Sequence, residues 1–114
     1  MTYNLKSLPE QILVITGATS GHGLATARMA ADAGARLIIV SRDEEALREV
    51  RDDLRDRGAE VEYKVADVGD EDQIQAVADF AVERFGGFDT WINNAGVGVY
   101  GKALEVSTED HERV

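Results

Sequence analysis

Residues 12–23 read ILVITGATSGHG, and the architecture of the chain can be worked out from them. The apolar run Ile12 to Ile15 is typical of a parallel strand buried on both faces. Three glycines follow it, and an alanine-rich amphipathic segment then runs from Leu24 to Ala33. Glycine allows a sharp turn and a close approach of the backbone, while the free N–H groups at a helix start attract anions. The stretch therefore predicts a strand, a tight turn and a helix start that together form a cradle for the phosphates of a dinucleotide.

The same alternation continues along the chain. Further strands are expected at residues 37–40, 61–65 and 90–92, and the first two strands are expected to be central neighbours. Helices are expected between these strands, each ending at glycine: the first at Gly34, the second at Gly58 and the third at Gly86 and Gly87. Ser41 and Glu44 have capping-box spacing at the start of the second helix, and Asp70 and Gln73 have it at the start of the third.

These elements predict an α/β fold of the Rossmann type, in which a parallel sheet is doubly wound by right-handed crossovers. A last helix is expected to begin at Ser107, but only about two turns fit before Val114, whereas an average helix has about 11–12 residues. We therefore expect residues 1–114 to be a single domain that is truncated after its fourth strand. No linker or low-complexity segment divides the chain.

Composition limits the classes of function. The chain has 12 basic and 22 acidic residues, and its net charge of −10 opposes binding to nucleic acid or to an anionic membrane. It has no cysteine, which excludes disulfides, a thiol nucleophile and cysteine-ligated zinc, and no metal site is expected. Residues 1–10 lack the apolar core of a signal peptide, and no apolar stretch approaches membrane-spanning length. We expect a cytoplasmic protein.

Three motifs, each at the carboxyl end of an expected strand, resemble those of the short-chain dehydrogenase/reductase family. The glycines are spaced G-x-x-x-G-x-G, unlike the commoner G-x-G-x-x-G. Asp67-Val68 follows the third strand, and Asn93-Asn94-Ala95-Gly96 follows the fourth. The resemblance covers essentially the whole chain, which corresponds to the first half of a typical family member.

The resemblance implies a nicotinamide cofactor held at these strand ends. Asp67 and Val68 would contact its adenine, and Asn94, Ala95 and Gly96 would flank it. A further set would surround its pyrophosphate and the adjoining ribose: Gly17, Thr19, Ser20, Gly21, His22 and Gly23. An alternative is that the glycines only turn the chain and allow close helix packing. His22 stands where the family usually has an apolar residue; its imidazole either bonds phosphate or ribose or lies half exposed on the first helical turn, and the second is favoured slightly.

The end of the second strand bears on the choice between the two nicotinamide cofactors. A carboxylate there accepts hydrogen bonds from the ribose 2′-hydroxyl of NAD and repels the 2′-phosphate of NADP. This chain has Ser41 and Arg42 instead, and an arginine can hold a phosphate bidentately. NADP is therefore expected over NAD. Asp43 is the competing candidate, which would serve the ribose diol of NAD or act as an acid in a helix first turn.

The family's proton-transfer residues, a tyrosine four residues before a lysine and an upstream serine, cannot be placed. Tyr3, Tyr63 and Tyr100 have no lysine at that spacing, so catalytic residues are expected beyond Val114. The resemblance implies an NADP-dependent oxidoreductase that interconverts a small-molecule alcohol and a carbonyl when complete, and homo-oligomers are common in the family. The 114-residue chain itself is expected to bind cofactor without turnover. Two alternatives are a non-catalytic NADP-binding or redox-sensing module and an S-adenosylmethionine-dependent methyltransferase.

Overall fold

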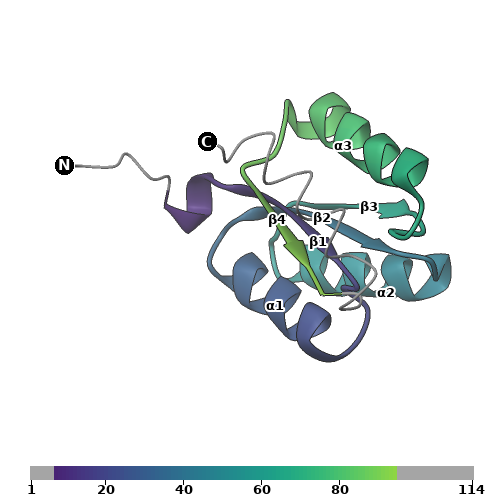
Figure 1. Ribbon diagram of the computed structural model, residues 1–114. Helices are drawn as coiled ribbons and strands as arrows, with labels where there is room; N and C mark the ends of the chain where they lie inside the picture. Colours follow the sequence, from purple (N-terminus) through teal and green to yellow (C-terminus); the bar gives the residue numbers. More distant parts are fainter. Residues whose placement is uncertain (1–6, 95–114) are drawn as a thin grey trace.

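The computed structural model describes residues 7–94, and these form a parallel sheet covered by helices on both faces (Figure 1). A 3-10 turn, η1 (Leu8–Glu10), precedes the sheet. The strands are β1 (Ile12–Thr16), β2 (Arg36–Ser41), β3 (Val61–Val65) and β4 (Thr90–Asn93). The helices are α1 (Gly21–Asp32), α2 (Glu44–Asp56) and α3 (Glu71–Phe85). The doubly wound, Rossmann-type α/β class expected from the sequence is confirmed.

The order of the strands in the sheet is β3-β2-β1-β4, and every pair is parallel. The chain first steps outward from β1 to β2 and β3, with α1 and α2 on one face of the sheet. Helix α3 then carries it back over the other face, so that β4 pairs with the free side of β1 (Figure 1). The direction of the winding therefore reverses between β1 and β4.

Alternate residues of the two central strands supply two separate cores. Leu13, Ile15, Leu37 and Ile39 pack with buried residues of α1 and α2, whereas Val14, Ile38 and Val40 pack with Val77 and Ala81 of α3. A strand needs an unbroken apolar run when both of its faces are covered in this way. The continuous runs at residues 12–15 and 37–40 therefore identified the two central strands correctly.

The helix ends agree with the glycine signals, but the start of the second helix was predicted wrongly. Ser41 remains in β2, where its carbonyl accepts from the Ala66 N–H at 3.0 Å. The N-cap of α2 is Asp43, whose Oδ1 accepts from the Ala46 N–H at 3.1 Å. Two capping residue types lie close together here, and pairing with β3 keeps the first of them in the strand.

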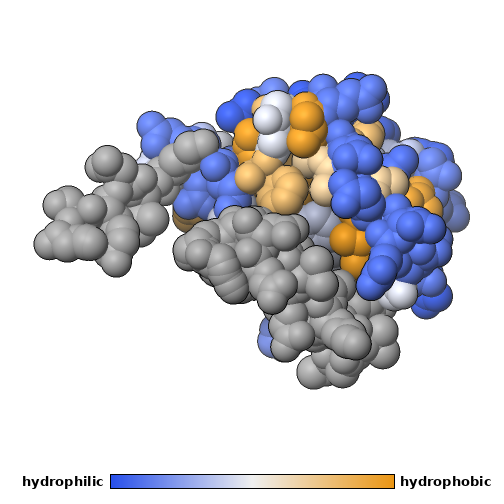
Figure 2. Space-filling view, turned by 45° about the horizontal axis from the view of Figure 1, so that its top comes forward, coloured by the Kyte–Doolittle hydropathy of each residue, from blue (hydrophilic) through white to orange (hydrophobic). Residues whose placement is uncertain are grey.

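Much of the described surface is hydrophilic, and Figure 2 shows hydrophilic residues around a more apolar area. The large apolar side chains exposed among the described residues are Leu8, Met29, Val65 and Val82. Within residues 7–94, no helix is both long and apolar enough to span a bilayer. The helix expected from Ser107 lies outside the described residues.

Candidate functional site

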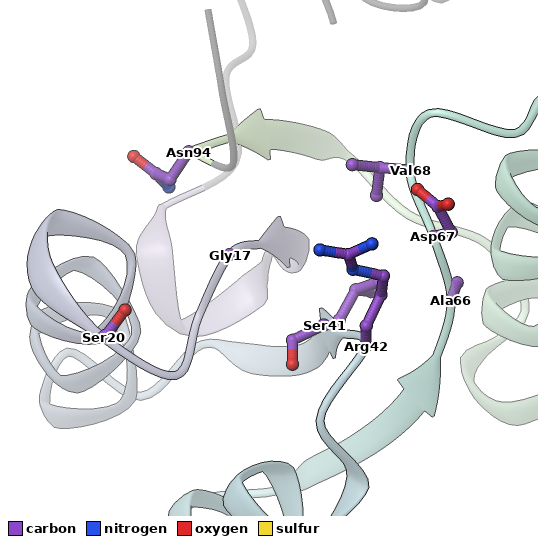
Figure 3. Close-up of a pocket in the computed structure, with 9 residues that line it drawn as sticks. Gly17, Ser20, Ser41, Arg42, Ala66, Asp67, Val68 and Asn94 are labelled. Carbon is purple, nitrogen blue, oxygen red and sulfur yellow. The ribbon is translucent and has the colours of Figure 1, made fainter.

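A pocket of about 260 Å³ opens at the carboxyl ends of the strands, beside the reversal between β1 and β4 (Figure 3). Ligands of open α/β sheets bind at this position because the loops after the two strands diverge there. The loops after all four strands contribute to the pocket. Its lining residues are Gly17, Ser20, Val40, Ser41, Arg42, Ala66, Asp67, Val68 and Asn94.

The three motif glycines have different structural roles. Gly17 and Gly21 have φ of 62° and 57°, in the left-handed region that other residues rarely adopt, so they turn the chain. Gly23 lies inside α1 and is buried, and a Cβ built on it would lie 1.8 Å from the Gly17 carbonyl oxygen. The helix start is therefore packed directly against the turn that follows β1. Chain turning and close packing, which the sequence offered as the alternative role of these glycines, are both observed at these positions.

The start of α1 differs from the starts of the other two helices. Its N-cap, Ser20, makes no side-chain capping hydrogen bond, and its first turn has no acidic residue. By contrast, Asp43 and Asp70 cap α2 and α3 through their carboxylates, and acidic residues follow both: Glu44 and Glu45 in α2, and Glu71 and Asp72 in α3. The partial positive charge at the start of α1 is therefore not neutralised by the described protein groups, and the Ser20 hydroxyl lies at the pocket.

At the end of β2, the guanidinium of Arg42 and the hydroxyl of Ser41 reach the pocket. Arg42 lines it, and among residues 7–94 no hydrogen bond or ion pair engages its guanidinium, which extends toward the space between Gly17 and Val68 (Figure 3). The Ser41 hydroxyl accepts from the Asp43 N–H at 2.9 Å, which leaves its own proton available to a ligand. Asp43 itself is not among the lining residues, because its carboxylate caps α2.

The turn after β3 presents a neighbouring acceptor and donor. Asp67 Oδ1 accepts from the Gly69 N–H at 2.9 Å, whereas its Oδ2 has no partner among the described residues. The Val68 N–H likewise makes no hydrogen bond within the described part of the chain, and the Val68 side chain is buried. Both residues line the pocket, so these two polar atoms are available to a bound ligand.

The ends of β1 and β4 are tied together through a buried hydroxyl. Thr16 Oγ1 donates to Asn93 Oδ1 at 2.8 Å and accepts from the Asn94 N–H at 3.2 Å. Thr16 is fully buried, so this link is shielded from water. Asn94 then carries its side chain to the pocket, where its buried Nδ2 has no hydrogen-bond partner among residues 7–94. An unpaired buried donor is costly, which makes it a candidate contact for a ligand.

The sequence expectations can be compared with these positions residue by residue. Of the expected site residues, those that line the pocket are Gly17, Ser20, Ser41, Arg42, Asp67, Val68 and Asn94. Thr19 is half-buried, Gly21 and His22 are exposed and Gly23 is buried, and none of these lines it. Ala95 and Gly96 lie outside the described residues. Val40 and Ala66 also line the pocket but were not predicted, because each looks like core at a strand end.

An open parallel sheet with helices on both faces and a pocket at its switch point defines the Rossmann-type class of α/β proteins. Residues 11–114 match the family model described as short chain dehydrogenase, and the chain belongs to that family. Its motifs after β1, β3 and β4 are the residues on which the resemblance was based.

Individual relatives agree with this assignment. The uncharacterized oxidoreductase YxnA of Bacillus subtilis (strain 168) is 48% identical over 110 residues, which are 96% of this chain and 31% of YxnA. A CLA biosynthesis dehydrogenase/reductase of Lactiplantibacillus plantarum is 40% identical over 95% of this chain and 38% of its own length. The chain therefore spans about a third of the length of these curated relatives.

Solved structures show the same fold. A short-chain dehydrogenase/reductase from Burkholderia phymatum in complex with NAD superposes with a TM-score of 0.77 and is 44% identical, covering 82% of this chain and 34% of that one. L-sorbose reductase from Gluconobacter frateurii, complexed with NADPH and L-sorbose, has a TM-score of 0.74 and 37% identity, covering 77% and 34%. Both of these structures hold a nicotinamide cofactor.

Proposed function

We propose that this chain forms the cofactor-binding part of an NADP-dependent oxidoreductase that interconverts an alcohol and a carbonyl on a small molecule. The observation that carries the proposal is the unpaired Arg42 guanidinium at a pocket on the switch point, beside a helix start without acidic residues. The relatives with NADPH or NAD in their structures support the nicotinamide class of cofactor.

The pocket atoms fit such a cofactor. The pyrophosphate would lie at the start of α1, where free N–H groups and the Ser20 hydroxyl face an anion with no competing carboxylate. The adenine would lie at the turn after β3, against the apolar Ala66 and Val68, with the free Val68 N–H beside it. Asn94 Nδ2 would find its missing acceptor on the cofactor. His22 is exposed and does not line the pocket, which supports the reading in which its imidazole lies on the first helical turn rather than on the cofactor.

Two features of the loop after β2 favour NADP over NAD. The Asp43 carboxylate, the candidate acceptor for the ribose diol of NAD, is engaged at the N-cap of α2. Arg42 and the Ser41 hydroxyl instead offer a cation and a donor, which suit a phosphate on the ribose 2′ position. The residues at the end of β2 therefore suit the ribose 2′-phosphate of NADP better than the ribose diol of NAD.

When bound, the nicotinamide supplies the hydride, and this chain supplies binding and orientation. The family's tyrosine and lysine are not found at the expected spacing around Tyr3, Tyr63 or Tyr100. We therefore assign no proton-transfer step to these 114 residues and expect no turnover from them alone. A small-molecule substrate, a homo-oligomer and a cytoplasmic location stay predictions.

Fluorescence titration of the purified protein with NADPH, NADH and S-adenosylmethionine tests the proposal. Saturable binding of NADPH, tighter than that of NADH, is expected. Binding of S-adenosylmethionine alone would contradict it. An oxidoreductase assay with a panel of small carbonyl compounds on the full-length protein then separates the enzyme from a non-catalytic NADP-binding module, which would bind NADPH without oxidising it.

A further inference from the structure

The side chain of Gln73 bridges the turn between β3 and α3. Its Oε1 accepts from the Asp67 N–H at 2.7 Å, and its Nε2 donates to Asp70 Oδ2 at 3.1 Å. The Asp70 N–H donates in turn to the Asp67 carbonyl at 3.0 Å. Gln73 therefore joins Asp67, in the turn after β3, to Asp70, the residue that caps α3. The spacing of Asp70 and Gln73 suggested a capping box, but Gln73 reaches past the cap to Asp67 instead.

This closure determines which polar atoms of the turn remain for a ligand. The Asp67 N–H is used by Gln73, and Asp67 Oδ1 is used by the Gly69 N–H at 2.9 Å. Asp67 Oδ2 and the Val68 N–H have no partners among the described residues, and both residues line the pocket. An acceptor beside a donor complements the edge of adenine, where an amino group adjoins a ring nitrogen.

We propose that Gln73 is a positioning residue for the base-binding end of the pocket, and that through it Asp67 Oδ2 and the Val68 N–H are held ready to read the adenine amino edge. Gln73 does not line the pocket and acts only through Asp67 and Asp70. This inference rests on the proposed function, because it requires a cofactor that carries adenine.

The physical basis is preorganisation. A turn that is already held in its binding geometry does not have to be ordered when the ligand arrives. Loss of Gln73 would release the Asp67 N–H and one link to Asp70. Directional hydrogen bonds to the adenine amino group would then weaken, whereas apolar contacts with Val40, Ala66 and Val68 depend less on the geometry of the turn.

The experiment compares NADPH with its deamino analogue, in which hypoxanthine replaces adenine and an oxo group replaces the amino group. Kd values for both are measured by fluorescence titration of the full-length protein. The wild type is expected to prefer NADPH by about tenfold. Gln73→Ala is expected to reduce this preference to about twofold, through weaker binding of NADPH with little change for the analogue. Loss of fold alone would weaken both ligands equally and leave their ratio unchanged.

Gln75→Ala is the matched control. Gln75 lies on the same helix and makes a comparable exposed hydrogen bond, from Nε2 to Asp79 Oδ1 at 3.0 Å, but it does not reach the turn or the pocket. This variant is expected to keep the wild-type ratio. Gln73→Glu is a second variant of similar size. It keeps an acceptor for the Asp67 N–H but cannot donate to Asp70, so it is expected to lower the ratio as well.

The outcomes separate the two proposals. If the wild type prefers NADPH and the Gln73 variants keep that full preference, the positioning role of Gln73 is overturned and the proposed function stays intact. A wild type that binds both ligands equally also overturns the inference, because the amino group is then not read. A wild type that binds neither ligand overturns the proposed function and this inference with it.

Discussion

Replacement of Gly23 by alanine tests whether the packing of α1 against the turn after β1 shapes the site. The added Cβ would lie 1.8 Å from the Gly17 carbonyl oxygen, whereas carbon and oxygen normally approach to about 3.3–3.6 Å. The turn and the helix start must therefore separate by about 1.5 Å. This movement would strain the hydrogen bond from the Gly17 N–H to the Val40 carbonyl, which measures 2.9 Å.

The magnitude follows from two opposing terms. Overpacking of this kind costs about 1–3 kcal/mol or more, and the better helix propensity of alanine recovers up to about 1 kcal/mol. We take the upper part of the overpacking range because the clash is with backbone atoms on both sides, and we expect a net loss of about 2 kcal/mol. For a domain of this size that loss lowers Tm by about 8–16 °C.

Thermal unfolding followed by circular dichroism measures the loss, and NADPH titration measures the effect on the site. Gly58→Ala is the control, because a Cβ on Gly58 would meet open space, unlike one on Gly23, and Gly58 lies at φ 93° after α2 and outside the pocket. It should cost about 1–2 kcal/mol through backbone strain and leave the Kd of NADPH unchanged. A Gly23→Ala protein with wild-type Tm and wild-type NADPH affinity would refute the reasoning.

Three further substitutions test other parts of the site. Arg42→Ala should raise the Kd of NADPH by about tenfold or more and the Kd of NADH by less than about twofold, as measured in parallel titrations. An equal loss of affinity for the two cofactors would count against a contact between Arg42 and the 2′-phosphate. Thr16→Val removes the buried hydroxyl between β1 and β4 and should lower the free energy of unfolding, measured in urea, by about 1–3 kcal/mol. Thr16→Ser keeps the hydroxyl and should lower it less. Equal losses in the two variants would argue against a stabilising role of these hydrogen bonds. Asp43→Ala removes the α2 N-cap and should cost about 1 kcal/mol of stability with equally small effects on the Kd values of NADPH and NADH. A selective loss of NADH affinity would contradict the assignment of Asp43 as a cap, because it would show that the carboxylate serves the ribose diol.

The architecture could be predicted from the sequence because its signals are local. Unbroken apolar runs report strands covered on both faces, and Gly34, Gly58 and Gly86, all at positive φ, report helix ends. The sequence also predicted that Arg42, Asp67 and Asn94 lie close together, because parallel strands bring their carboxyl ends to the same edge of the sheet; all three line one pocket.

The remaining details depend on contacts that spacing does not encode. Ser41 and Asp43 are both suitable caps, and only pairing of Ser41 with β3 decides between them. Val40 and Ala66 are apolar and belong to the core, so the fact that they also line the pocket follows from the positions of their strand ends in three dimensions. Close helix packing was one expected role of the motif glycines, but the particular contact of Gly23 with the Gly17 carbonyl is known only from the structure.

The most direct test of the central claim, that this pocket holds NADP, is a crystal structure of the full-length protein grown with NADP. We predict electron density for the pyrophosphate at the start of α1, with the 2′-phosphate contacted by Arg42 and the adenine against Val68. Density for the cofactor elsewhere, or a 2′-phosphate that points to solvent away from Arg42, would contradict the account.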